Sequence, residues 1–171
     1  NLTIVRQYAP HSRIMAVIKA DAYGHGLLTT ANALKDVDGF ALLELDAAIS
    51  LREAGYQQPI LLLEGFFSIE ELALFEQYQL SAVIHHSEQV SMLLDSKHHE
   101  LNLFLKINTG MNRLGLAPEQ LSKTINKLKE NQKGSVIQAG NKFLAKMRDQ
   151  EIYSDGVTTW IKKKKNKEVQ I

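Results

Sequence analysis

Lys19 is the first residue of this sequence whose position suggests chemistry. It directly follows residues 14–18, a continuous apolar run that predicts a strand buried on both faces. In parallel α/β folds the active site lies at the C-terminal ends of the strands. Loss of water around an amine there favours the neutral form, which is the nucleophile and the Schiff-base former. The plainer interpretation is a lysine that reaches solvent at a strand end, so Lys19 needs support from its neighbours.

These neighbours form the segment 15–26, which reads MAVIKADAYGHG. Gly24 and Gly26 permit positive φ angles and a close approach of the backbone to a ligand. Tyr23 offers a phenol that could hold a phosphate oxygen. Taken alone, a Gly-His-Gly triplet is a weak signal, because most glycine pairs only form turns.

A second segment with chemical potential is 105–116, which reads LKINTGMNRLGL and contains Lys106 and Arg113. A guanidinium binds a planar carboxylate through two parallel hydrogen bonds, which makes Arg113 a candidate for binding an acid. A surface ion pair for Arg113 and a solvated strand end for Lys106 are the plain alternatives. The segment 105–116 therefore indicates a binding site only in combination with the segment 15–26.

Apolar runs and helical patterns alternate along the first 130 or so residues and indicate the elements that would position these side chains. Five strand–helix units of this kind are typical of a parallel α/β architecture. The pattern alone does not distinguish an open doubly wound sheet from a β/α barrel. The expected strands cover residues 14–18, 39–43, 60–63, 82–84 and 101–107.

Helix signals fall between these strands. A helix is expected around residues 27–34, and another from about Glu44, ending near Gly55. Ser68 and Glu71 have the spacing of a capping box, so a helix is expected to start at Ser68. Ser87 is the expected cap of the next helix. Pro118 suits the first turn of a further one, with Leu121, Ile125 and Leu128 on its apolar face.

Composition limits the class of protein. The chain is 44% hydrophobic and 23% charged, as in globular domains. The apolar runs stay well short of the roughly 18–20 residues that a membrane helix needs, which argues against a membrane protein. The sequence lacks cysteine, so it has no disulfides and no thiolate chemistry. Asn1 opens the chain without the pattern of a signal peptide, and we expect a cytoplasmic protein.

Charge is distributed unevenly between two parts of the chain. Residues 1–141 carry 12 Lys/Arg against 15 Asp/Glu, whereas residues 142–171 carry 8 against 4. Lys162 to Lys165 form an unbroken run, which we interpret as part of a solvated tail and not as a nucleic-acid site, because aromatic residues are not interleaved with it. The strand–helix rhythm fades after Lys133, and only 141–150 is weakly amphipathic. We expect two parts, 1–133 and 134–171, the second of uncertain structure.

Two histidine pairs, His85–His86 and His98–His99, raise the question of a metal site. Adjacent side chains project in different directions, and no carboxylate or cysteine ligand set accompanies them. We interpret them as ordinary, partly exposed histidines and expect no metal.

The two segments together resemble one family. MAVIKADAYGHG is similar, nearly residue for residue, to the pyridoxal-phosphate attachment motif of alanine racemases, and LKINTGMNRLGL resembles the next most recognisable motif of that family. Weaker similarity joins them, so the resemblance covers about residues 1–129. It implies the N-terminal part of a (β/α) barrel of the TIM type, here incomplete. The family's first strand is expected to be missing, because the sequence begins within the helix that precedes Ile14.

The resemblance implies roles for four residues. Lys19 would hold pyridoxal 5'-phosphate covalently and act as one of two bases on the α-proton of the substrate. Tyr23 would contact the cofactor phosphate. Arg113 would orient the substrate carboxylate and approach the cofactor ring oxygen, and Lys106 corresponds to a lysine that is carbamylated in some members. Asn108 departs from the family, which usually has aspartate there, and this affects the local hydrogen bonding.

The resemblance also implies a whole that is larger than this chain. The family has an eight-stranded barrel followed by a β-rich domain, acts as a homodimer on alanine, and supplies D-alanine for peptidoglycan. Its second base is a tyrosine of the β domain, delivered across the dimer interface. Residues 134–171 offer no counterpart, and the surroundings of Tyr153 do not match. We therefore expect little or no racemisation by these 171 residues.

Three hypotheses remain open from the sequence. The leading one is a segment of an alanine racemase. Another barrel of the same cofactor fold type, a basic amino-acid decarboxylase or the small pyridoxal-phosphate homeostasis protein, does not explain DAYGHG together with TGMNRLG. The third is a non-catalytic remnant, whose unmatched end would derive from a rearranged or out-of-frame gene.

Overall fold

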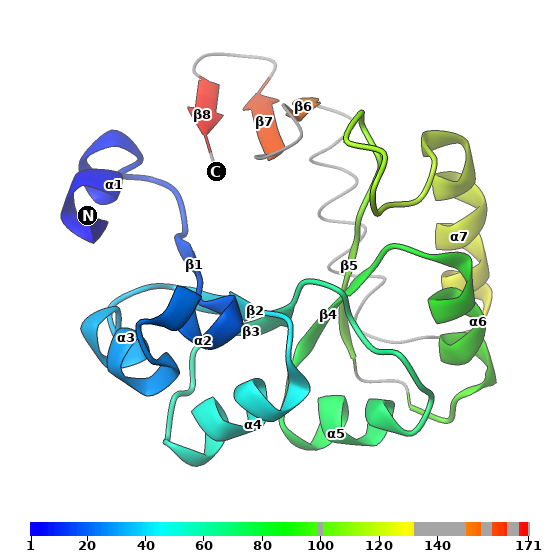
Figure 1. The fold of residues 1–171 in the computed structure, drawn as a ribbon. Coiled ribbons are helices and arrows are strands. Elements are labelled where there is room, and N and C mark those ends of the chain that lie inside the picture. Colours follow the sequence, from blue (N-terminus) through cyan, green and yellow to red (C-terminus); the bar gives the residue numbers. More distant parts are fainter. Residues whose placement is uncertain (99–100, 132–149, 155–158, 164–167, 171) are drawn as a thin grey trace.

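A computed structural model describes residues 1–98, 101–131, 150–154, 159–163 and 168–170 of the chain (Figure 1). Its main feature is a five-stranded sheet formed by β1 (Met15–Val17), β2 (Gly39–Leu42), β3 (Ile60–Leu62), β4 (Ser81–Ile84) and β5 (Asn102–Leu105). All five strands fall within the apolar runs predicted from the sequence, except that β4 begins one residue earlier. The three central strands, β2 to β4, are buried along their whole length, which favours continuous apolar sequence, whereas Met15 and Val17 of β1 and Phe104 of β5 are exposed.

The order of the strands distinguishes the two architectures that the sequence left open. Each strand pairs in parallel with the next one along the chain, in the order β1-β2-β3-β4-β5. A doubly wound sheet reverses its strand order at a switch point, whereas a barrel keeps one direction with all helices outside. The helices α3 to α7 lie along the outer side of the curved sheet (Figure 1). The fold is therefore an incomplete α/β barrel, as predicted.

The helices follow the strands in sequence. After α1 (Leu2–Tyr8) and the short α2 (Lys19–Gly24), five outer helices follow: α3 (Leu27–Ala33), α4 (Leu45–Glu53), α5 (Glu71–Gln77), α6 (Ser87–Asp95) and α7 (Pro118–Glu130). Gly55 has φ 91°, a left-handed conformation that glycine adopts without strain just past the end of α4. Pro118 is the first residue of α7, as the sequence indicated.

Two predicted helix starts were wrong. The helix expected at Ser68 begins at Glu71, because the Glu71 carboxylate accepts a hydrogen bond from the backbone N–H of Phe67 instead of forming a capping box with Ser68. The cap expected at Ser87 is His86, whose Nδ1 accepts from the backbone N–H of Glu88 at 3.3 Å. Ser87 is the first helical residue, so the cap prediction missed by one position.

The core lies between the sheet and the outer helices. Large side chains that are almost fully buried fill it from both sides: Phe40, Leu42, Ile60, Leu62 and Ile84 from the strands, and Leu51, Leu72, Phe75 and Leu93 from the helices. The opposite face of the sheet carries a smaller apolar cluster of Ala41, Leu61 and Val83. Side chains of a strand alternate between its two faces, so one apolar run supplies both clusters.

A separate antiparallel sheet contains β6 (Gln150–Ser154), β7 (Thr159–Lys163) and β8 (Glu168–Gln170). Most of the weakly amphipathic stretch 141–150 lies outside the described residues, as do Lys164 and Lys165 of the lysine run. Within the described parts of the chain, no helix is both long and apolar enough to span a membrane.

Candidate active site

The C-terminal edge of the parallel sheet brings together charged and polar residues from distant parts of the sequence. Lys19 follows β1 after one residue, Glu64 lies two residues past β3, and His85 and Lys106 directly follow β4 and β5. The ladder continues into this edge: the backbone N–H of Lys106 donates to the Ile84 carbonyl at 2.9 Å, and that of Ile18 donates to the Ala41 carbonyl at 2.8 Å. Parallel strands thus place all four side chains at one end of the fold.

Lys19 opens a backbone segment of unusual conformation. The next four residues, Ala20 to Tyr23, all have φ between 50° and 56°, in the left-handed helical region. For residues other than glycine this conformation costs roughly 1–2 kcal/mol each. Such strain persists only where the surrounding structure holds it, and it is concentrated at functional sites.

Several hydrogen bonds hold this left-handed turn. The backbone N–H of Ala22 donates to the Ile18 carbonyl at 3.1 Å, and that of Gly26 donates to the Asp21 carbonyl at 3.0 Å. The Asp21 carboxylate also accepts from the backbone N–H of Leu27 at 2.7 Å, at the start of α3. The turn therefore connects β1 to α3 rigidly, and it fixes the backbone that follows the Lys19 amine.

Tyr23 stands at the end of the left-handed turn. Its side chain is 61% exposed, so the structure leaves the phenol accessible to a ligand and does not bury it in the core. Lys19 itself is half-buried. Gly24 and Gly26, which the sequence singled out for positive φ, both have φ 85°. The conformation expected of these glycines is thus present.

The loop after β5 is organised by Asn108. Its side-chain oxygen accepts from the backbone N–H groups of Gly110 and Asn112, both at 3.1 Å, and its amide donates to the Asn112 side-chain oxygen at 2.9 Å. The backbone N–H of Leu116 donates to the Lys106 carbonyl at 2.8 Å and closes the loop. An ionised aspartate has no N–H to donate to Asn112, so asparagine here has a local structural reason.

Gly115 makes this closure possible. A Cβ on Gly115 would lie 2.6 Å from the backbone nitrogen of Asn108, closer than real side chains approach. Arg113 lies within the closed loop, and its side chain is exposed toward solvent. The hydrogen-bonded loop therefore holds the backbone of Arg113 next to the end of β5, and the long side chain extends from it into solvent.

The strand ends place several charges within electrostatic reach of the Lys106 amine. Burial lowers the pKa of Lys106, the positive charges of Arg113 and Lys19 lower that pKa further, and the Glu64 carboxylate raises it. The structure thus brings together three of the predicted residues, Lys19, Lys106 and Arg113. A cluster of cations at a strand edge attracts anionic groups such as carboxylates and phosphates.

Sequence reasoning missed two residues of this edge. Glu64 was not singled out, and His85 was considered only for metal binding. Burial lowers the pKa of His85, the Lys106 charge lowers it further, and hydrogen bonding to the Glu64 carbonyl raises it. The signal that could have found them is position, because each comes within two residues of the end of a buried apolar run, as Lys19 does.

The described residues contain no group of three or more histidine, cysteine, aspartate or glutamate side chains that could hold a metal ion. His98 instead pairs through Nδ1 with the Glu76 carboxylate at 2.6 Å. His99, the other member of that pair in the sequence, lies outside the described residues.

Comparison with known proteins defines the class. A family model described as the N-terminal domain of alanine racemase matches residues 1–151. The alanine racemase of Nitrosospira multiformis is 61% identical over 132 residues, which are 77% of this chain and 37% of that protein. The catabolic alanine racemase of Klebsiella aerogenes is 52% identical over 122 residues, 71% of this chain and 34% of that protein.

Solved structures agree with the sequence comparison. The biosynthetic alanine racemase of Pseudomonas aeruginosa superposes with a TM-score of 0.73 at 37% identity, over 78% of this chain and 38% of the other. That of Acinetobacter baumannii gives a TM-score of 0.69 at 35% identity, over 76% and 40%. The fold and site are thus those of an α/β barrel domain with a cationic edge. The chain belongs to the alanine racemase family, a family of isomerases, through its N-terminal domain.

The match covers most of this chain but only part of each relative. The chain spans about 37% of the length of the Nitrosospira relative and 38% of the Pseudomonas structure. The predicted resemblance to alanine racemases and the predicted α/β barrel are both confirmed. The division of the chain at residues 133 and 134 stays a prediction, and so do the roles assigned to individual site residues.

Proposed function

We propose that this chain carries the pyridoxal 5'-phosphate lysine and the substrate-carboxylate site of an alanine racemase, which interconverts L- and D-alanine for peptidoglycan synthesis. The observation that carries the proposal is the placement of Lys19, Lys106 and Arg113 at the C-terminal edge of the sheet, where the charges of Lys19 and Arg113 act on the Lys106 amine. A homodimer in the cytoplasm, with alanine as its substrate, is part of the same proposal.

The residues present fit this cofactor. Pyridoxal phosphate is an aldehyde that carries a phosphate, so it needs an accessible amine within cationic surroundings. Lys19 is half-buried at the strand edge, near Lys106, and the exposed phenol of Tyr23 follows on the same rigid turn. In this proposal Lys19 binds the aldehyde carbon and Tyr23 donates to a phosphate oxygen.

When bound, the cofactor supplies an electron sink that makes the α-hydrogen of an amino acid acidic. The chain's own groups then have separate tasks. Arg113 would bind the substrate carboxylate through its guanidinium. Lys19 Nζ, released as a free amine when the amine of the substrate takes its place on the cofactor, would accept the α-proton on one face of the substrate and return it. Lys106, as an amine or as its carbamate, would influence through its charge where the Arg113 guanidinium lies.

One base moves a proton on one face only. Racemisation needs a second acid–base group on the opposite face, and the proposal assigns no described residue to that role. We therefore expect slow exchange of the α-proton with solvent and little or no formation of D-alanine by this chain.

The first experiment is an absorption spectrum of the purified chain with added pyridoxal phosphate, before and after borohydride reduction. Wild type is compared with Lys19→Ala and with Lys123→Ala, a control that removes an exposed lysine of α7. A band that requires Lys19, but not Lys123, and that reduction makes permanent supports the proposal. Equal bands in all three proteins would contradict it.

A second experiment addresses the proton transfer. Loss of deuterium from α-deuterated alanine is followed with wild type and Lys19→Ala in the presence of pyridoxal phosphate. We expect faster loss with wild type, and equal rates would refute the assignment of Lys19 as a base. The alternative function, a remnant without catalysis that binds the cofactor weakly or not at all, predicts at most a weak Lys19-dependent band and no exchange, whereas the racemase proposal requires both the band and the exchange.

A further inference from the structure

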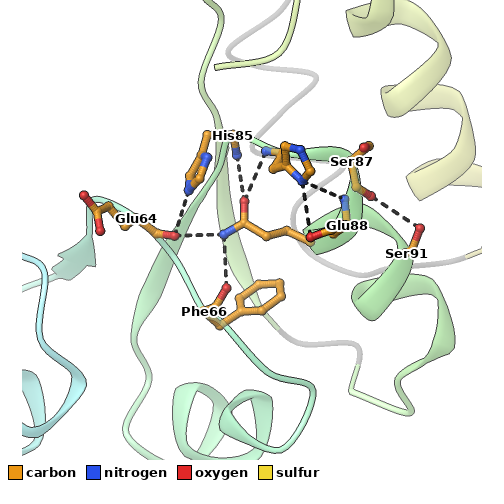
Figure 2. Close-up of polar contacts among 8 residues, drawn as sticks. Glu64, Phe66, His85, Ser87, Glu88 and Ser91 are labelled. Carbon is orange, nitrogen blue, oxygen red and sulfur yellow. Dashed lines mark hydrogen bonds and ion pairs between the residues drawn. The ribbon is translucent and has the colours of Figure 1, made fainter. Parts of the chain in front are cut away.

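Gln89 is a buried polar residue near the site, and its side chain has an unusually complete set of partners. It is 5% exposed at the start of α6. Its amide nitrogen donates to the carbonyl oxygens of Glu64 at 2.8 Å and Phe66 at 3.2 Å. Its amide oxygen accepts from the backbone N–H groups of His85 at 2.9 Å and His86 at 3.3 Å. Figure 2 shows these contacts.

These four bonds do more than cap a helix. Capping requires only the bond from the His86 N–H to the Gln89 oxygen. The nitrogen end of the same side chain points away from α6 to the loop 64–66, which follows β3. One side chain thus fastens the loops after β3 and β4 to each other, because all the hydrogen-bonding capacity of the amide is used between them.

The loop 64–66 is closely packed at Gly65. Gly65 packs so closely that an added Cβ would lie 2.4 Å from the Val83 carbonyl oxygen and 2.8 Å from the Gln89 amide nitrogen. His85 adds a further bond, with its Nε2 at 3.1 Å from the Glu64 carbonyl oxygen. Since a carbonyl only accepts, this bond requires the Nε2–H form of the ring. The backbone of Glu64 is therefore held from two sides.

We propose that Gln89 is a positioning residue for Lys106: its four hydrogen bonds fix the loop 64–66 and His85 at the end of β4, and thereby fix the backbone that carries Glu64 and His85 beside Lys106, whose N–H donates to the Ile84 carbonyl. The inference deepens the proposed function, because Lys106 belongs to the proposed site. Gln89 touches neither a substrate nor a cofactor in this proposal, and it acts through Glu64 and His85.

The charged groups around Lys106 come from every strand end that faces it. Arg113 and Lys19 contribute positive charge from the loops after β5 and β1, and Glu64 contributes negative charge from the loop after β3. His85, after β4, lies close enough for its own pKa to be lowered by the Lys106 charge. Burial and the two positive charges lower the pKa of Lys106, and the Glu64 charge opposes them, so losing that charge is expected to increase the fraction of neutral amine.

The test measures the reactivity of Lys106 itself, in the full chain without cofactor. Trace acetylation with acetic anhydride, read by mass spectrometry across pH 6–10, reports the fraction of neutral amine. Glu64→Gln removes the charge that raises the Lys106 pKa, so we expect acetylation of Lys106 near pH 7.5 to rise about three- to ten-fold. This readout does not depend on pyridoxal phosphate, so it can succeed or fail independently of the proposed function.

The role of Gln89 then follows from a double-mutant cycle. Gln89→Met keeps the length of the side chain and removes all four hydrogen bonds without adding charge. In that background we expect Glu64→Gln to change Lys106 acetylation by less than about two-fold. The control His86→Ala removes a cap at the same end of α6 and leaves the bonds to the loop 64–66, so the full Glu64 effect is expected there.

Each outcome decides the proposal. An unchanged Glu64 effect in Gln89→Met, or an effect lost equally in His86→Ala, would mean that Gln89 only caps α6. No Glu64 effect in the wild-type background would refute the link to Lys106. If circular dichroism shows that Gln89→Met is unfolded, Gln89→Asn, which is one methylene too short to reach the Glu64 carbonyl, gives the same comparison.

Discussion

The two ends of the sheet use charge in opposite ways. At the N-terminal end, Arg52 of α4 donates to four backbone carbonyls, those of Tyr56 and Gln58 before β3 and those of Tyr78 and Gln79 before β4. At the C-terminal end, the positive charges of Lys19 and Arg113 and the negative charge of Glu64 all act on the Lys106 amine. At the N-terminal end the guanidinium has backbone carbonyls as hydrogen-bond acceptors, whereas at the C-terminal end several cations lie at one edge of the sheet.

This difference indicates which end of the sheet contributes to stability and which end is suited to binding a ligand. In β/α barrels, the N-terminal face serves stability and the C-terminal face carries the active site. The left-handed turn 20–23 lies at the second end, where it costs free energy and positions the residues around Lys19. The described residues therefore separate a stabilising end from a functional end within one small sheet.

Breaking the stabilising end is expected to have the largest effect on stability. Arg52→Met removes the charged donor from four carbonyl groups, so we expect the free energy of unfolding to fall by about 2–3 kcal/mol. Urea unfolding followed by circular dichroism measures this, with Arg13→Met, which changes an exposed arginine, as the control. If Arg52→Met lowers the free energy of unfolding no more than Arg13→Met does, the four hydrogen bonds of Arg52 do not stabilise this end of the sheet.

The strain at the functional end predicts a change of opposite sign. Ala20→Gly relieves a left-handed alanine at φ 51°, and we expect a gain of up to about 1 kcal/mol in the free energy of unfolding after the entropy of glycine in the unfolded chain is counted. Ala73→Gly, in the exposed interior of α5, should instead lose about 1 kcal/mol. Losses of similar size at both positions would show that the turn is not strained.

A smaller effect concerns the dependence of stability on pH. Burial holds the pKa of His85 below its usual value, so between that lower pKa and about 6.5 the unfolded state binds more protons than the folded state. Stability should therefore fall as the pH drops through about 6.5. His85→Gln should flatten this fall in urea unfolding at pH 5.5–7.5, whereas the exposed-residue control His11→Gln should keep it. The same slope in all three proteins would contradict the burial effect.

Much of the fold followed from apolar periodicity. All five strands lie in or within one residue of predicted runs, and the three central ones are buried on both faces, which requires continuous apolar sequence. Helix starts were less predictable, because side chains compete for the same backbone N–H groups. The helix expected from Ser68 begins at Glu71, whose carboxylate accepts from the Phe67 N–H, and His86 with Gln89 took the role expected of Ser87.

The site was predictable to the extent that its residues carried family motifs. The charges of Lys19 and Arg113 act on Lys106, whereas Glu64 was not singled out and His85 was considered only for metal binding, because their influence on Lys106 comes from tertiary contacts. The left-handed turn could not be predicted either. Ala20 to Tyr23 contains no glycine, and local propensity places such residues at negative φ.

The most direct test of the central claim is to locate the cofactor on the chain. The protein is mixed with pyridoxal phosphate, reduced with borohydride, digested, and mapped by mass spectrometry. Our structure predicts that the reduced pyridoxyl group is found mainly on Lys19, ahead of exposed lysines such as Lys97 and Lys123. Labelling spread evenly over the exposed lysines, with Lys19 no more modified than the others, would contradict the assignment of the functional end.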